Sequence, residues 1–79
     1  MRLDKFLKVS RIIKRRTVAN DACDASLVTV NARPAKASYD VRVGDVLTVS
    51  FGERRLRVRV LSLQESTKKA DAASMYEIL

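Results

Sequence analysis

The chain opens with Met1-Arg2-Leu3-Asp4-Lys5-Phe6-Leu7-Lys8-Val9, which has the spacing of an amphipathic helix. At about 100° per residue, its apolar side chains fall on one side: Leu3, Phe6 and Leu7. Its basic side chains fall on the opposite side: Arg2, Lys5 and Lys8. Asp4 lies in the first turn, where the helix dipole stabilises an anion. The stretch predicts a helix over residues 2–9 with one buried face and one basic face.

Positive charge is concentrated at this end of the chain. Residues 1–16 hold seven basic residues and one acidic residue, which leaves almost none of the formal net charge of +7 for the rest. A local excess of this size draws a polyanion to one face. Two other interpretations remain open, a solvated lysine-rich helix and an amphipathic helix on a membrane surface. The apolar side is short and contains no Trp, which disfavours the membrane.

Composition narrows the class of protein. Seventy-nine residues, 47% apolar and 32% charged, fit one small folded domain. Without an apolar run of membrane length or a signal-peptide core, we expect a cytoplasmic protein with no membrane partner. The chain has no His, one Cys and two Gly, so it offers no Cys–His nucleophile, zinc cluster or glycine-rich phosphate loop. We expect no enzymatic activity, no catalytic or metal-binding residue, no cofactor and no small-molecule substrate.

The rest of the sequence predicts a second helix and then strands. Thr17 is the expected N-cap of a helix over residues 18–25, after a basic connector over residues 12–16. The expected buried stripe of this helix comprises Val18, Ala19, Ala22 and Cys23. From Leu27 the apolar period changes to two, which predicts strands over residues 28–30, 46–51 and 56–61. Arg57 and Arg59 face away from the core, where a solubilising role is favoured over an RNA site.

These elements predict an α+β fold, with two N-terminal helices on a small, mainly antiparallel β-sheet and a short C-terminal helical tail. We expect a domain over residues 1–65 and a tail over residues 66–79. Thr67 would cap a helix to about residue 74, and apolar residues after it could fold back on the core. The expected core comprises Leu3, Phe6, Val28, Val30, Val49, Val58 and Val60, together with Phe51.

Four motifs occur in the order and spacing of a known family: Arg-Leu-Asp-Lys-Phe-Leu at 2–7, Val-Thr-Val-Asn at 28–31, Ala-Lys-Ala-Ser at 35–38 and Val-Gly-Asp at 43–45. Over about residues 1–60 the chain resembles the RNA-binding domain named after ribosomal small-subunit protein four, the S-four domain. Residues 8–17 and the tail are most similar to its small stand-alone members in bacterial ribosome-associated quality control. The fifteen-kilodalton heat-shock protein is the next most similar member.

The resemblance implies that the two helices and the following loop form an αL motif that binds structured RNA. The RNA-binding residues that it implies are Arg2, Lys5, Lys8, Arg11, Lys14, Arg15, Arg16, Arg33 and Lys36. It further implies an accessory factor that binds rRNA and peptidyl-tRNA on obstructed large ribosomal subunits and supports alanine tailing by a NEMF-family factor. We expect a monomer. A detached module of an RNA-modifying enzyme, a heat-shock-type rescue protein and a nonspecific nucleic-acid binder remain alternatives.

Binding of this kind rests on phosphate neutralisation, and Arg can grip a phosphate with two hydrogen bonds. We therefore rank Arg2 and Arg16 above the lysines. The four aromatic residues are too few for a base-stacking platform, although Tyr39 could stack in a turn. The chain departs from the family at Ala32 and Ser26, where Gly is usual. If the turn at Ala32 needs a positive φ, Ala costs about 1 kcal/mol or more.

Overall fold

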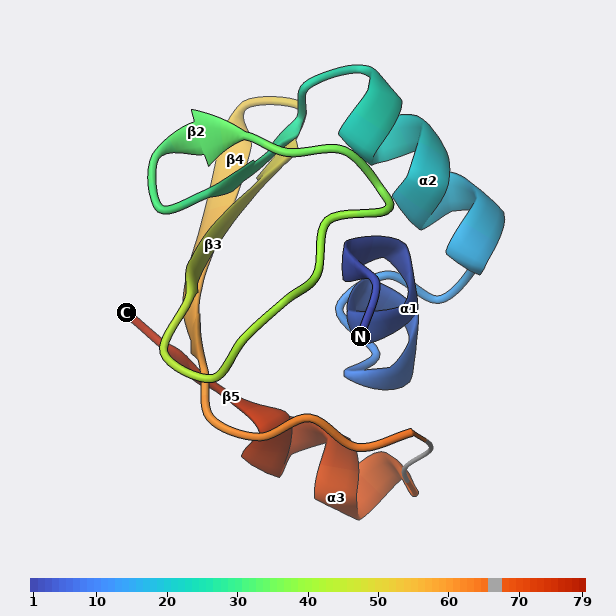
Figure 1. Ribbon diagram of the computed structural model, residues 1–79, viewed down its shortest axis with the longest axis vertical. Helices are drawn as coiled ribbons and strands as arrows, with labels where there is room; N and C mark the ends of the chain where they lie inside the picture. The colour runs from blue at the N-terminus through green and yellow to red at the C-terminus, as the bar shows by residue number, and fades with distance from the viewer. Residues whose placement is uncertain (66–67) are drawn as a thin grey trace.

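The computed structural model describes residues 1–65 and 68–79, and it confirms the predicted α+β fold (Figure 1). The two N-terminal helices are α1 (Leu3–Val9) and α2 (Arg16–Asp24). Four strands follow: β1 (Val28–Val30), β2 (Arg33–Pro34), β3 (Val46–Phe51) and β4 (Arg54–Val60). The chain ends with α3 (Lys69–Ala72), the 3-10 helix η1 (Ala73–Met75) and β5 (Tyr76–Ile78). The strands form one antiparallel sheet in the order β2-β1-β3-β4-β5.

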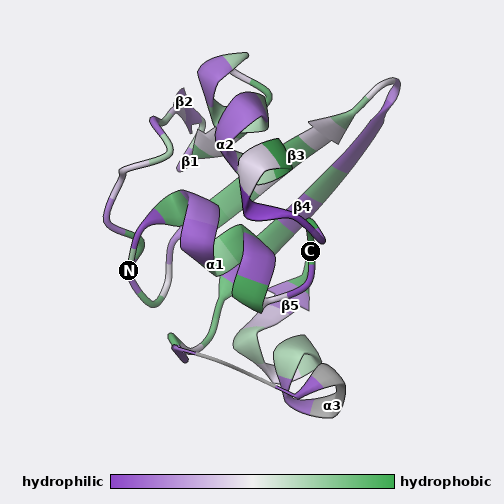
Figure 2. Ribbon diagram, turned by 90° about the vertical axis from the view of Figure 1, so that its right-hand side faces the viewer, coloured by the Kyte–Doolittle hydropathy of each residue, from purple (hydrophilic) through white to green (hydrophobic). Residues whose placement is uncertain are grey.

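The core lies between one face of this sheet and the N-terminal helices (Figure 1). Alternate residues of β1, β3 and β4 point into it, as a period of two requires. Apolar and polar segments also alternate along α1 (Figure 2), whose side chains at positions 3, 6 and 7 are fully buried. Apart from Phe51, the residues predicted for the core are all buried: Leu3, Phe6, Val28, Val30, Val49, Val58 and Val60.

Three local predictions were wrong. Phe51 is 44% exposed because it lies at the end of the β3–β4 hairpin, which extends beyond the helices (Figure 2). Val18 is 49% exposed, and only Ala19 and Cys23 of its expected stripe are buried. Thr17 does not cap α2, because the helix starts two residues earlier than predicted, at Arg16, and its N-cap is Arg15.

The tail adds a strand that the sequence did not predict. β5 pairs with β4 through Val58↔Ile78 and Val60↔Tyr76, so it forms one edge of the sheet. Met75, just before it, is fully buried against the core, as expected of an apolar tail residue. The predicted cap at Thr67 lies outside the described residues.

Both turns where Gly is usual have left-handed backbone. The φ angle is 59° at Ser26 and 70° at Ala32, and Asn31 before it has a φ of 52°. For a residue with a Cβ, this region costs roughly 1–2 kcal/mol. The turn at Asn31 and Ala32 joins β1 to β2. The Asn31 side chain donates a hydrogen bond to Asp45 and accepts one from the backbone N–H of Val46, and these two bonds offset part of the strain in the turn.

Candidate nucleic-acid interface

A buried carboxylate organises the basic residues between α1 and α2. Asp4 is only 2% exposed, and its oxygens accept hydrogen bonds from two arginines. The Nε and Nη2 atoms of Arg2 lie 3.1 and 3.3 Å from Asp4, and Nη2 of Arg16 lies 3.4 Å from it. The Asn20 side chain, 3.4 Å away, and the Lys5 backbone N–H, 2.8 Å away, complete the set.

These contacts set the ionisation of the carboxylate. Burial alone would raise the pKa of Asp4, but the hydrogen bonds from Arg2, Asn20 and Arg16 outweigh it and lower the pKa to about 2. Asp4 is therefore charged at neutral pH. Each arginine side chain is about half exposed, so donors that Asp4 does not use face solvent. The pair is held in place yet open to a second anion.

Three adjoining hollows connect this pair to the loop after β2. The first is lined by Arg2, Asp4, Arg16, Thr17, Asn20 and Asp21. The second, of about 570 Å³, shares Arg2 and Asn20 with the first and reaches Lys36. The third shares the segment around Lys36 and extends to Arg33 and Tyr39. We call this continuous surface the groove. It brings together four of the nine predicted RNA-binding residues: Arg2, Arg16, Arg33 and Lys36.

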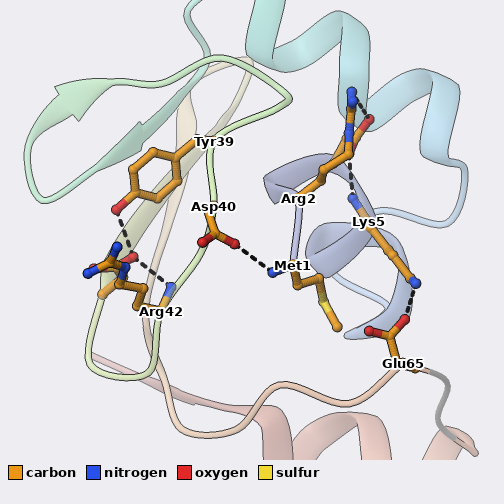
Figure 3. A network of polar contacts seen from close by, with 9 residues as sticks. Met1, Arg2, Lys5, Tyr39, Asp40, Arg42 and Glu65 are labelled. Atoms are coloured by element: carbon orange, nitrogen blue, oxygen red, sulfur yellow. Dashed lines mark hydrogen bonds and ion pairs between the residues drawn. The ribbon is translucent and has the colours of Figure 1, made fainter.

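Backbone hydrogen bonds fix the two walls of the groove relative to each other. The N–H groups of Leu3 and Asp4 donate to the carbonyls of Tyr39 and Ala37, at 2.8 and 3.1 Å. The N-terminal amine also pairs with Asp40 at 2.7 Å, which lowers the pKa of that carboxyl (Figure 3). These contacts hold the start of α1 against the loop that carries Lys36, and Arg2 lies where the two segments meet.

The remaining five predicted residues lie outside the groove. Lys5 forms an ion pair with Glu65, sixty residues away, so its amine turns toward the tail (Figure 3). The side chains of Lys8, Arg11, Lys14 and Arg15 are exposed on α1 and on the connector between the helices. They add positive charge to the surface of α1 and of the connector, but they do not line the groove.

Sequence reasoning missed Asn20 and Asp45. Asn20 lies one helical turn after Arg16, which is the spacing for side chains on one helix face, so the contact could have been inferred once Arg16 was placed in α2. Asp45 accepts hydrogen bonds from Tyr39, Asn31 and the Arg42 backbone, and nothing in its local sequence marks it as a hub.

The described residues hold no group of three or more His, Cys, Asp or Glu side chains that could bind a metal. Burial, together with the charges of Asp4 and Asp24, raises the pKa of the Cys23 thiol to about 11, so it is a neutral core residue at neutral pH. In the part of the chain that the structure describes, no helix has the length and hydropathy to cross a membrane.

Comparison with known proteins places this geometry in context. The model of the S4 domain family matches residues 1–47. The chain is 56% identical over 79 residues to the RQC P-site tRNA stabilizing factor of Bacillus subtilis (strain 168), covering all of this chain and 92% of that protein. The protein of the same name from Streptococcus pneumoniae (strain ATCC BAA-255 / R6) is also 56% identical, with 100% and 90% covered. The trimeric structure of Vibrio cholerae heat shock protein 15 superimposes with a TM-score of 0.94 at 25% identity, covering 100% of this chain and 81% of that one.

Proposed function

The chain belongs to the S4 domain family, and we propose on that premise that it is an RNA-binding factor of ribosome-associated quality control that stabilises tRNA in the P site. The observation that carries this proposal is the buried Asp4, which presets Arg2 and Arg16 at one end of the groove. Two guanidinium groups held by one carboxylate lose little side-chain freedom when they bind phosphate, and their unused donors suit phosphate oxygens.

We further propose the partners of this activity. The groove and the exposed basic residues beside it would bind rRNA of the large ribosomal subunit and peptidyl-tRNA left after a stalled ribosome splits. A monomer bound there would support alanine tailing of the stalled chain by a NEMF-family factor. Exposed cations lie both on the connector, at Arg15, and in β2, at Arg33, and this supports contact with more than one RNA segment.

Sucrose-gradient sedimentation of a tagged copy, followed by RNA crosslinking, tests the proposal. We expect the chain to sediment with free large subunits and to crosslink to rRNA and tRNA. Arg16→Ala should reduce the amount bound, whereas Arg57→Ala, on the outer face of the sheet, should not. Sedimentation mainly with small subunits, or equal reduction in both variants, would contradict the proposal.

A heat-shock-type rescue role is the second candidate, because the similarity to heat shock protein 15 spans the whole chain. Deleting this protein, with alanine tails and blocked large subunits as the readouts, separates the two roles. The proposed function predicts loss of alanine tails from nascent chains when this protein is absent. A rescue role independent of tailing predicts unchanged tails and accumulation of blocked large subunits.

A further inference from the structure

The aromatic ring at the far end of the groove is held in a fixed orientation. The Tyr39 hydroxyl donates a hydrogen bond of 2.9 Å to Oδ2 of Asp45 (Figure 3). The same carboxylate accepts a hydrogen bond of 3.0 Å from the Arg42 backbone N–H and one of 3.1 Å from the Asn31 side chain. Because Asp45 is tied to two other segments, the ring of Tyr39 is restrained at its distal end as well as at its backbone.

The hollow beside this ring combines apolar walls with cations. It has a volume of about 680 Å³ and is lined by Tyr39, by the apolar residues Val30, Pro34 and Ala35, and by Arg33 and Lys36. Arg33 and Lys36 are exposed, and Tyr39 is half-buried. An apolar wall for a flat ring, flanked by two positive charges, is complementary to a nucleobase and its neighbouring phosphates.

We propose that this end of the groove binds a single unstacked nucleotide of RNA, with the base against the ring of Tyr39 and the flanking phosphates on Arg33 and Lys36. This inference rests on the proposed RNA-binding function and adds a base-binding subsite to it. Arg2 and Arg16, at the other end, then hold the backbone of the adjoining helix.

Such a subsite distinguishes RNA by its structure and not by its base sequence. The major groove of a continuous RNA helix is too deep and narrow for side chains to read, so a base becomes accessible only in a loop, at a bulge or at an end. Stacking on an aromatic ring tolerates every base, because each has a π-face. The expected preference is for RNA with an extruded nucleotide, with little dependence on which base it is.

Two RNA hairpins that differ only in one single-nucleotide bulge test the proposal. Each is titrated with the full chain at one fixed, low salt concentration. We expect the wild-type chain to bind the bulged hairpin about 5- to 150-fold more tightly than the paired one, which corresponds to about 1–3 kcal/mol for stacking one base on an aromatic side chain.

Substitutions at Tyr39 separate the ring from its hydroxyl. Tyr39→Phe removes the hydrogen bond to Asp45 but keeps the ring, so a preference for the bulge should remain. Tyr39→Leu keeps an apolar side chain but removes the ring, so both hairpins should bind with the affinity of the paired one. Phe51→Leu is the matched control, because it removes an exposed ring on the β3–β4 hairpin. It should leave the preference unchanged. Thermal unfolding of each variant confirms that it is folded.

The outcomes distinguish this inference from the function on which it rests. If the wild-type chain binds neither hairpin, the RNA-binding function fails, and the subsite fails with it. If it binds both hairpins equally, or if folded Tyr39→Leu retains the full preference for the bulge, RNA binding stands and the subsite is overturned.

Discussion

Oδ1 of Asp4 lies 3.4 Å from Nη2 of Arg16, twelve residues further along the chain, and the same carboxylate holds Arg2. The contact joins the first turn of α1 to the first residue of α2. Asp4 is buried, whereas both arginines are about half exposed. One acidic residue in the most basic segment of the chain therefore lowers the net charge, yet it fixes the two cations that we rank highest for phosphate binding.

Asp4 should make the stability of the fold depend on acidic pH. Its pKa falls from 3.8 to about 2 on folding, so its stabilising contribution is present above pH 3.8 and is lost as the pH falls through 2. We expect Asp4→Asn to lower the free energy of unfolding at neutral pH by about 1–2 kcal/mol. Urea unfolding at a series of pH values should show this difference shrinking as the pH falls below 4. Asp24→Asn is the control, because Asp24 is an exposed carboxylate at the end of α2. If the difference in stability between Asp4→Asn and wild type does not change with pH, the prediction is contradicted.

Arg16 should bind at least one phosphate. In a titration with large-subunit rRNA, Arg16→Ala should lower the slope of log affinity against log salt by about 0.7–0.9 for each phosphate that the variant no longer neutralises. Arg16→Lys should recover only part of the affinity if the grip on phosphate uses two hydrogen bonds. Arg57→Ala removes an equal charge from β4, opposite Thr48 on the outer face of the sheet, and should change the slope little. A larger effect of Arg57→Ala would place the RNA on the strands.

The parts of the fold that follow from local periodicity were predictable. The stripe at positions 3, 6 and 7 of α1 and the alternation along β3 and β4 identify the core without any knowledge of pairing. β5 was not predictable in this way, because three residues that include Glu77 carry too little periodicity. They form a strand because β4 offers them an edge.

The candidate site was predictable only in its residue types. Charge identified the basic segment, but the partners of individual cations depend on contacts across the fold. Lys5 pairs with Glu65 and Arg16 with Asp4, and neither pairing follows from helical spacing alone. The groove itself needs the loop after β2, whose position is set by backbone hydrogen bonds to Leu3 and Asp4.

Phe6 should be indispensable for folding. Its side chain is fully buried between the helices and the sheet, and Phe→Ala substitutions in cores cost about 3–5 kcal/mol. Small domains have about 5–15 kcal/mol of stability, so Phe6→Ala should unfold a large fraction of the molecules or lower the melting temperature severely. Phe51→Ala, at the exposed end of the β3–β4 hairpin, should have a much smaller effect. Circular dichroism melting curves that coincide for Phe6→Ala and wild type would contradict the packing of α1.

Ala32→Gly should stabilise the protein. Ala32 has a φ of 70°, which costs a residue with a Cβ roughly 1–2 kcal/mol, and its exposed side chain loses no packing when removed. The greater freedom of Gly in the unfolded chain offsets about 0.4–1 kcal/mol of that gain, so we expect a net increase of about 0.5–1 kcal/mol in the free energy of unfolding. Gly52→Ala is the reverse control. Gly52 has a φ of 58°, and a Cβ there would meet no atom of the described chain within 4 Å, so any destabilisation comes from the backbone alone. Urea unfolding of both variants should give shifts of opposite sign, and a destabilised Ala32→Gly variant would show that the turn gains more from the restricted backbone of Ala than it loses to strain.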